Sequence, residues 1–237
     1  MGLRAVLLAG GQGTRLRPYT VALPKPLMPV GEWPILEIII RQLASRGFDH
    51  ISLAVNHQAD LLRAYFGDGA RWNVRIDYSL ETVPLSTMGP LTLMKDLPAD
   101  FLVMNGDVLT DLDYRGLYEF HRSRGSIFTV SAHARTQKIE YGVLRTDDAG
   151  LLNGFQEKPE LDYLVSMGVY IASRRVLEHI PKGIAFGFDH LMLRLIEAGT
   201  PALVRTYEGY WLDIGRPDDY QEAVDVFEKN RGLFLRE

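Results

Sequence analysis

The strongest constraint on the fold is an alternation of two patterns through the first half of the chain. Short apolar runs typical of buried strands occupy residues 4–8, 50–55, 74–79 and 101–104. Segments with apolar residues at helical spacing occupy residues 34–46, 59–66, 88–97 and 114–123. Strands that alternate with helices in this way predict an α/β fold: a Rossmann-like, mainly parallel sheet with helices on both faces. In such a sheet, ligands bind at the carboxyl ends of the strands.

The second half of the chain predicts a mixed α+β region. Strand patterns occupy residues 127–132, 141–146, 151–156, 165–171 and 202–206. Helical patterns occupy residues 174–180, 189–198 and 217–229. The sequence Asp147-Asp148-Ala149-Gly150 separates two of these strands and is typical of a hairpin turn.

Composition excludes several classes of protein. Lys and Arg number 26 against 30 Asp and Glu in 237 residues, a net charge of −4, which argues against a broad surface for nucleic acid. The chain has no cysteine, so disulfides and thiolate metal sites are impossible. No apolar run reaches the roughly 20 residues of a membrane span. The six histidines lack the paired spacing of a zinc site. We therefore expect a cytoplasmic protein that binds neither nucleic acid nor membranes.

Three glycines directly follow the first strand. Gly10, Gly11 and Gly13 allow backbone N–H groups to approach a phosphate or a base closely. The dinucleotide-binding fingerprint would need another glycine where Leu16 stands, and the chain has no Gly-Lys-Ser/Thr sequence, so both common phosphate motifs are absent. A tight turn beside a solvated Arg15 is the alternative interpretation.

Two prolines flank Lys25. Pro24 and Pro26 stiffen the backbone, so the ammonium group of Lys25 is held in one place. A positioned lysine suits phosphoryl transfer. A proline-rich surface loop with an idle lysine is the alternative interpretation of this segment alone.

Taken together, the glycine-rich and lysine segments resemble the signature of the sugar-1-phosphate nucleotidyltransferases, also called nucleotide-sugar pyrophosphorylases. Further blocks of that signature follow in order: Asn105-Gly106-Asp107, Tyr141-Gly142, Glu157-Lys158-Pro159, Gly168-Val169-Tyr170 and residues 211–217. The resemblance covers most of the chain. It is to the short branch of the family, in which no β-helix or acyltransferase domain is appended.

The resemblance implies an enzyme that transfers a nucleotidyl group from a nucleoside triphosphate to a sugar 1-phosphate and releases pyrophosphate. It implies Mg²⁺ as cofactor. We expect a single nucleotidyltransferase domain over residues 1–237, in which residues 1–135 mainly bind the nucleotide. Residues 136–237 would form the sugar-phosphate-binding part and the C-terminal helix. Both a monomer and a homodimer are compatible with the sequence.

The resemblance also implies roles for individual residues. The catalytic positions are Arg15 and Lys25, and the metal ligands are Asp107 and Asp213. The sugar-phosphate-binding positions are Asn105, Gly142, Glu157 and Lys158. The nucleotide-binding positions are Leu8, Ala9, Gly10, Gly11, Gly13, Thr14, Pro84, Gly89 and Asp107. From the residues alone, Asp107 is as readily a turn residue or a helix cap.

The base should be selected by the loop at residues 80–90. Family members often have glycine and alanine where this chain has Ser86 and Met88, and a larger side chain near the base would alter the pocket. The glutamine with which many uridylyl- and thymidylyltransferases read a pyrimidine is not evident. The loop is more similar to that of mannose- and heptose-1-phosphate guanylyltransferases, which favours GTP. A uridylyltransferase acting on a hexosamine or muramic acid phosphate is the nearest alternative.

Two hypotheses of other classes remain. A metal-dependent glycosyltransferase would use Asp111 and Asp113, which form a D-x-D pair, but it gives no reason for the glycine-rich segment. A non-catalytic homologue that binds a nucleotide sugar would usually have lost its charged site residues, and these are present.

Overall fold

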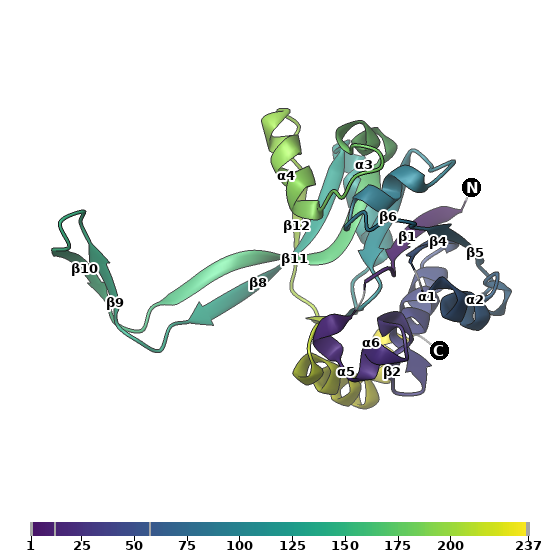
Figure 1. Cartoon of the computed structure of the whole chain (residues 1–237), viewed down its shortest axis with the longest axis horizontal. Coiled ribbons are helices and arrows are strands. Elements are labelled where there is room, and N and C mark those ends of the chain that lie inside the picture. Colours follow the sequence, from purple (N-terminus) through teal and green to yellow (C-terminus); the bar gives the residue numbers. More distant parts are fainter. Residues whose placement is uncertain (1, 12, 57, 236–237) are drawn as a thin grey trace.

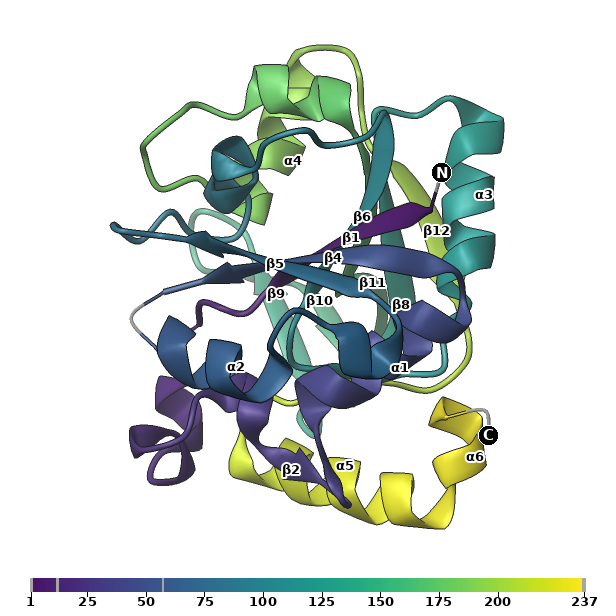
Figure 2. The same ribbon diagram turned by 90° about the vertical axis from the view of Figure 1, so that its right-hand side faces the viewer.

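A seven-stranded sheet forms the centre of the protein, with strand order β12-β8-β11-β6-β1-β4-β5 (Figures 1 and 2). The computed structural model describes residues 2–11, 13–56 and 58–235, so Gln12 of the glycine-rich segment and His57 lie outside the described residues. The sheet strands are β1 (Leu3–Leu8), β4 (Phe48–Val55), β5 (Arg75–Leu80), β6 (Asp100–Asn105), β8 (Phe128–Lys138), β11 (Glu160–Ser173) and β12 (Leu203–Tyr207).

The predicted, mainly parallel sheet is confirmed, with one reversed strand. β1 pairs in parallel with β4 and β6, β4 with β5, and β8 with β12. β11 runs antiparallel to both of its neighbours, β6 and β8. Leu8 at the end of β1 lies opposite Ala54 and Asn105, so the carboxyl ends of three strands meet at one edge.

Helices cover both faces of the sheet. They are α1 (Ile35–Ser45), α2 (Ala59–Phe66), α3 (Tyr114–Arg124), α4 (Phe188–Glu197), α5 (Pro217–Lys229) and α6 (Arg231–Phe234). Alternate residues of a strand point to opposite faces. Ala5 and Leu7 accordingly join the apolar cluster under α1, whereas Val6 joins the cluster under α4. Figure 2 shows α4 on one side of the sheet and α1, α2 and α5 on the other. None of the helices in the described ranges has the length and apolar character needed to cross a membrane.

A buried carboxylate ties α1 to its neighbours. Glu37 has no exposed surface. It accepts hydrogen bonds from Arg41 at 2.9 and 2.6 Å, from the Tyr65 hydroxyl at 2.7 Å and from the Trp72 indole at 3.2 Å. Burial favours the protonated form, but the bonds from Tyr65, Arg41 and Trp72 outweigh it and lower the pKa of Glu37 below its ordinary value. The side chain thus joins α1, α2 and the 3₁₀ turn η4 (Ala70–Trp72).

Two helices predicted from the sequence are short 3₁₀ turns instead. The segment 88–97 forms only η5 (Gly89–Leu93), and the segment 174–180 forms η6 (Arg174–His179). The N–H groups of Met88 and Gly89 both donate to the carbonyl of Phe186, which ties the start of η5 to a distant segment. Met94 is already extended. Tertiary contacts therefore override the helical spacing of this stretch.

β8 and β11 are much longer than predicted, and their extensions form a projecting arm. We define the arm as residues 134–164. It contains the outer parts of both strands and a hairpin made of β9 (Val143–Thr146) and β10 (Leu152–Gln156). Figure 1 shows the arm reaching away from the rest of the protein. All residues of the arm are described, and none is buried. A two-stranded ribbon surrounded by solvent has no buried face, so the strand ends were predicted too early.

Candidate active site

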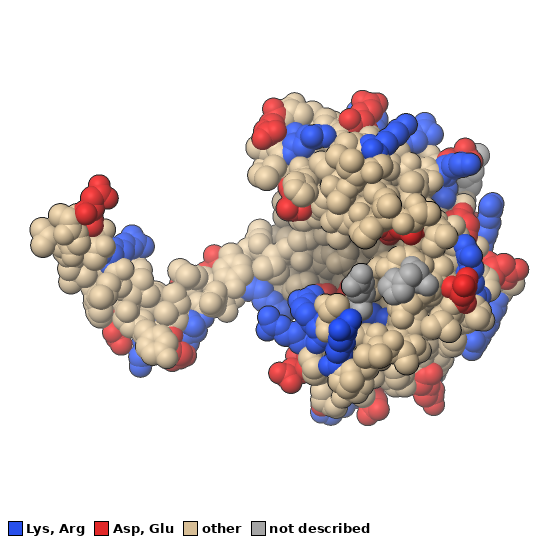
Figure 3. Space-filling view, in the orientation of Figure 1, with Lys and Arg blue, Asp and Glu red and all other residues tan. Residues whose placement is uncertain are grey.

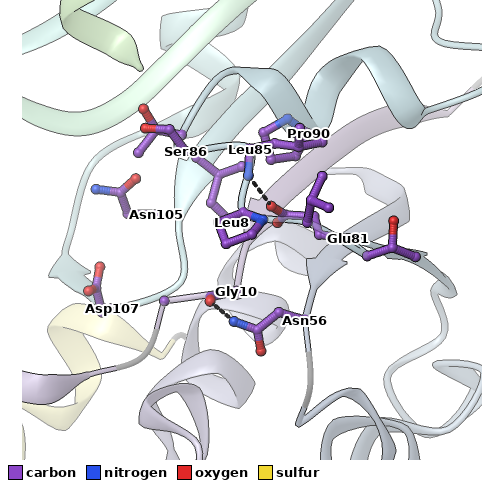
Figure 4. A pocket seen from close by; sticks show the side chains of 14 residues that line it. Leu8, Gly10, Asn56, Glu81, Leu85, Ser86, Pro90, Asn105 and Asp107 are labelled. Carbon is purple, nitrogen blue, oxygen red and sulfur yellow. Dashed lines mark hydrogen bonds between the residues drawn. The ribbon is translucent and has the colours of Figure 1, made fainter. Parts of the chain in front are cut away.

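A pocket of about 510 Å³ lies at the carboxyl edge of the sheet. It opens where β1, β4, β5 and β6 end, which is the position predicted for a ligand. Among its lining residues are Leu8, Gly10, Gly11, Pro84, Asn105 and Asp107, all of them predicted site positions (Figure 4).

The glycine-rich segment leads from β1 into the 3₁₀ turn η1 (Thr14–Leu16). Gly13 has a φ of +62°, and a Cβ atom there would lie 2.9 Å from the Thr20 side chain, so only glycine fits. The Thr20 hydroxyl donates to the Gly13 carbonyl at 2.7 Å, which holds the turn. Gly10 and Gly11 line the pocket. Ala9 is buried, and its N–H donates to the carbonyl of Ala54.

Lys25 begins the 3₁₀ turn η3 (Lys25–Leu27) and lies between Pro24 and Pro26. Its ammonium is buried and forms an ion pair with Oδ2 of Asp107. Asp107 lies between β6 and β7 (Val108–Thr110), at the floor of the pocket. Its other oxygen, Oδ1, is buried and has no hydrogen-bond partner among the described residues. This carboxylate therefore has one oxygen engaged and one available to a ligand.

A second carboxylate comes from a distant part of the chain. Asp213 ends β13 (Trp211–Asp213), which pairs with β7, and the N–H of Ile214 donates to the Asp107 carbonyl at 3.0 Å. Burial and the neighbouring charge of Asp107 raise the pKa of Asp213, while Lys25 and Arg15 act in the opposite direction. Two carboxylates flanked by two cations are thus brought together. One or two carboxylates with substrate phosphates are a typical ligand set for Mg²⁺, so these residues fit that ion.

Asn105 ends β6 and faces the pocket (Figure 4). The register of β11 shifts beside it, between Ser166 and Tyr170. Gly168 within this shift has a φ of +73°, and a Cβ atom there would lie 2.6 Å from the Asn105 amide nitrogen. A side chain at position 168 would therefore displace Asn105.

Two polar residues of the pocket were missed by the sequence analysis. Asn56, just after β4, donates a hydrogen bond to the Gly10 carbonyl. Glu81, just after β5, accepts a bond from the Leu85 N–H at 3.2 Å, and burial raises its pKa. A Cβ atom on Gly10 would lie 2.9 Å from Oε1 of Glu81. Both residues could have been predicted from the sequence to lie at the edge where ligands bind, because each directly follows a strand whose carboxyl end lies there.

The loop at residues 80–90 contains the two departures from the family pattern, Ser86 and Met88. Their positions in the structure differ. Ser86 has a φ of +63°, a conformation that favours glycine, which is the residue that family members often have there. Met88 is fully buried in the core with Phe101 and does not line the pocket. The expectation that its size alters the base pocket is wrong. Gly89, predicted to bind nucleotide, is buried with its N–H bonded to Phe186.

Some predicted residues lie away from the pocket lining. Gly13 and Thr14 lie beyond it, and Arg15 is exposed near Gly215 and Asp213. The predicted sugar-phosphate positions Gly142, Glu157 and Lys158 are all on the arm and exposed. A Cβ atom on Gly142 would lie 3.2 Å from Oε2 of Glu157, so these two residues are neighbours there. The structure does not bring them to the pocket, and their roles remain predictions.

The D-x-D pair has structural partners. Asp111 accepts a hydrogen bond from the Tyr207 hydroxyl at 2.6 Å, and Asp113 pairs with Arg46 at 3.3 Å. Both carboxylates therefore hold strands and helices together, which disfavours the glycosyltransferase hypothesis. Within the described ranges, no group of three or more His, Cys, Asp or Glu side chains could hold a metal ion.

Comparisons with known proteins identify the family. Residues 4–230 match the family model described as nucleotidyl transferase. A UTP–glucose-1-phosphate uridylyltransferase of Synechocystis is 34% identical over 99% of the chain and 64% of its own length. A mannose-1-phosphate guanylyltransferase of Mycobacterium tuberculosis is 32% identical over 91% of the chain and 62% of its own length. The chain thus spans slightly less than two thirds of the length of these curated relatives.

A solved structure of similar length also matches. HddC from Yersinia pseudotuberculosis is 27% identical, with a TM-score of 0.74 over 96% of this chain and all of that one. A second HddC structure, complexed with GMP-PN, is 26% identical with a TM-score of 0.70.

Proposed function

The chain belongs to the nucleotidyl transferase family, and from that premise we propose that it transfers a guanylyl group from GTP to a sugar 1-phosphate. The products are a GDP-sugar and pyrophosphate. A mannose- or heptose-type sugar is favoured, because several relatives are named mannose-1-phosphate guanylyltransferases. The resemblance of the loop at residues 80–90 favours the same class.

The observation that carries the proposal is the cluster of Lys25, Asp107 and Asp213, of which Asp107 lines the pocket. These residues come from three distant segments, and their charges are partly buried. A site that holds opposite charges in place before substrate arrives suits a reaction between phosphates, in which negative charge must be neutralised.

The proposed reaction has one chemical step. An oxygen of the sugar 1-phosphate attacks the α-phosphorus of GTP, and the bond from that phosphorus to the β-phosphate oxygen breaks, which releases pyrophosphate. The sugar phosphate is already a nucleophile, so the site needs positioning and charge neutralisation rather than a general base. Lys25 stabilises negative charge around the reacting phosphates, and Arg15 holds the departing pyrophosphate. Lys158 is assigned to the sugar phosphate.

The free Oδ1 of Asp107 and the carboxylate of Asp213 would hold Mg²⁺. When bound, the ion neutralises charge on the triphosphate. Among the protein groups, Asp107 keeps Lys25 in place through its other oxygen, so one side chain positions the ammonium and presents the metal ligand.

Glu81 supports guanine as the base. The Watson–Crick edge of guanine presents two adjacent N–H donors, and an ionised carboxylate is an acceptor for both. Glu81 lines the pocket beside the glycine-rich segment, with Oε2 on the Leu85 N–H and Oε1 against Gly10. Uracil offers a single N–H between two carbonyls, which a carboxylate pairs with poorly. A uridylyltransferase is the second candidate, because the Synechocystis relative carries that name.

Pyrophosphate release tests the proposal. The assay uses the full chain with Mg²⁺ and a matrix of GTP, UTP, dTTP, CTP and ATP against mannose-, heptose-, glucose- and N-acetylhexosamine-type 1-phosphates. Release with GTP and one sugar phosphate is the expected result. Release only with UTP and a hexosamine-type phosphate would support the second candidate. Release of nucleoside diphosphate instead of pyrophosphate would contradict the whole class.

A further inference from the structure

The arm places predicted site residues out of reach of their own pocket. β12 accompanies β8 only to His133, which lies opposite Tyr207. From there β8 pairs with β11 alone, from Ala134 opposite Leu164 to Lys138 opposite Glu160. Five residues per strand give a ribbon of roughly 17 Å before the hairpin region begins. Gly142 lies between β8 and β9, and Glu157 and Lys158 lie between β10 and β11, so all three are beyond that ribbon. Figure 1 shows β9 and β10 at the far end of the arm.

The surface of the arm is unusually apolar for a segment with no buried residue. Eight of the twenty large hydrophobic side chains exposed among the described residues are on it: Tyr141, Leu144, Leu151, Leu152, Phe155, Leu161, Tyr163 and Leu164. Leu144 is 63% exposed and Phe155 is 59% exposed. In Figure 3 most of the arm carries neither charge colour. Exposed apolar side chains gathered on one segment in this way are typical of a contact with another molecule.

The arm is continuous with the sheet. From Ala132 to Lys138, β8 pairs with β11 without a register shift, and the shift in β11, between Ser166 and Tyr170, lies on the core side of the arm. A paired ribbon extends in the direction of its parent strands, so folding it back onto its own pocket would break ladder hydrogen bonds. The predicted sugar-phosphate residues therefore point toward a site on another molecule.

We propose that two copies of this chain exchange arms in a symmetric dimer, so that Glu157 and Lys158 of each copy complete the pocket of the other. The inference rests on the proposed function, because those two residues are assigned to the sugar phosphate. Exchange in both directions closes the assembly at two copies. If each of the eight apolar side chains loses on the order of 100 Å² of exposed surface, the arm buries roughly 800 Å², the area per partner of a stable interface.

The rim of the pocket complements the arm. Val83 lines the pocket and is 53% exposed. Tyr19 and Val21 are exposed on the 3₁₀ turn η2 (Tyr19–Val21), which bonds to the glycine-rich segment through Thr20. Figure 3 shows Lys and Arg atoms gathered on the core near the base of the arm.

Complementation between two inactive variants tests the exchange. Lys25→Ala removes the cation of the core, and Lys158→Ala removes that of the arm. In a mixed dimer with exchanged arms, one site carries both defects and the other carries none. Co-expression of the two chains should therefore restore about a quarter of wild-type activity, the share of intact sites at random pairing. If each arm serves its own pocket, every site carries one defect, and activity that stays at the level of the two parents would overturn the proposal.

Two measurements do not depend on activity, so they separate a failure of the exchange from a failure of the proposed function. Light scattering should give the mass of a dimer for the wild-type chain and about half that mass for Leu144→Asp combined with Phe155→Asp. Leu193→Asp on α4, where the side chain is 60% exposed, is the matched control and should remain dimeric. A wild-type monomer at micromolar concentration would overturn the proposal.

The absence of cysteine allows a direct readout of which copies meet. Oxidation of Val83→Cys combined with Lys158→Cys should give a covalent dimer on a non-reducing gel. A disulfide that forms within one chain, seen as a faster-migrating monomer, would show that the arm folds back onto its own pocket and would overturn the exchange.

Discussion

Replacing Glu81 by glutamine should change the base that the protein prefers. The exchange keeps the size of the side chain, and the amide oxygen can still accept the bond from the Leu85 N–H, which is 3.2 Å long. The amide nitrogen then lies where Oε1 lies now, beside the pocket-lining Gly10. An acceptor that faces the pocket is thus replaced by a donor, while the loop keeps its internal bond.

The size of the effect follows from these contacts. A hydrogen bond to a charged group contributes about 1.5–3 kcal/mol, and a donor placed against a guanine N–H adds an unpaired group. We expect a loss of about 2.8 kcal/mol, or about 100-fold in kcat/KM with GTP. The amide matches the N–H and carbonyl of uracil, so kcat/KM with UTP should rise about tenfold.

The assay is pyrophosphate release at subsaturating GTP and UTP, with Thr82→Val as the control. Thr82 also lines the pocket, and its variant should change neither value by more than about threefold. Burial raises the pKa of Glu81, so kcat/KM of the wild type with GTP should fall as the pH drops toward that pKa and the carboxylate is protonated. The glutamine variant should lack this fall. A GTP-to-UTP preference that is unchanged in the glutamine variant would refute the reasoning.

Substitutions at three other positions test the site and the structure that supports it. Lys25→Ala should lower kcat by about 100-fold, on the order of 3 kcal/mol, and wild-type turnover in a folded variant, checked by circular dichroism, would contradict its role. Glu37→Gln should lower the free energy of unfolding at pH 7 by about 2–3 kcal/mol in urea titrations. Because folding lowers the pKa of Glu37, its contribution is complete above the unfolded pKa and is lost as the pH falls through the folded pKa, so the two curves should converge in acid; parallel curves would contradict this. Ser86→Gly should raise the free energy of unfolding by about 0.5 kcal/mol and Ser86→Val should lower it by about 1–2 kcal/mol, because the backbone there has a positive φ; the reverse order would contradict the strain.

The parts of the fold that local pattern determines were predictable. The helix expected at residues 59–66 and the one expected at 217–229 have the bounds observed for α2 and α5. The pairing of β7 with β13 was not predictable, because it joins segments about a hundred residues apart and each strand has only three residues. The arm was missed for a different reason: a strand with both faces in solvent carries no alternation of apolar and polar residues.

In the candidate site, too, local pattern and distant contacts must be separated. Family resemblance supplied Lys25, Asp107 and Asp213, and the structure brings them together, although no local pattern could show that they meet. Glu81 was not predicted, because its position beside Gly10 depends on the pairing of distant strands. The placement of Glu157 and Lys158 depends on the direction in which a long ribbon leaves the sheet, which sequence spacing does not specify.

The antiparallel strand β11 connects the arm to the pocket. One continuous backbone runs from the outer arm to the register shift at Gly168, where a Cβ atom would collide with the Asn105 amide at the pocket. Beyond that shift, Val169 and Tyr170 pair with β6, the strand that ends at Asn105. The ribbon is fixed to the sheet at one end, so a tilt of the arm would first move the backbone at Gly168. The amide resonance of Asn105 would then report whether the distant hairpin is docked or free, before any substrate is added.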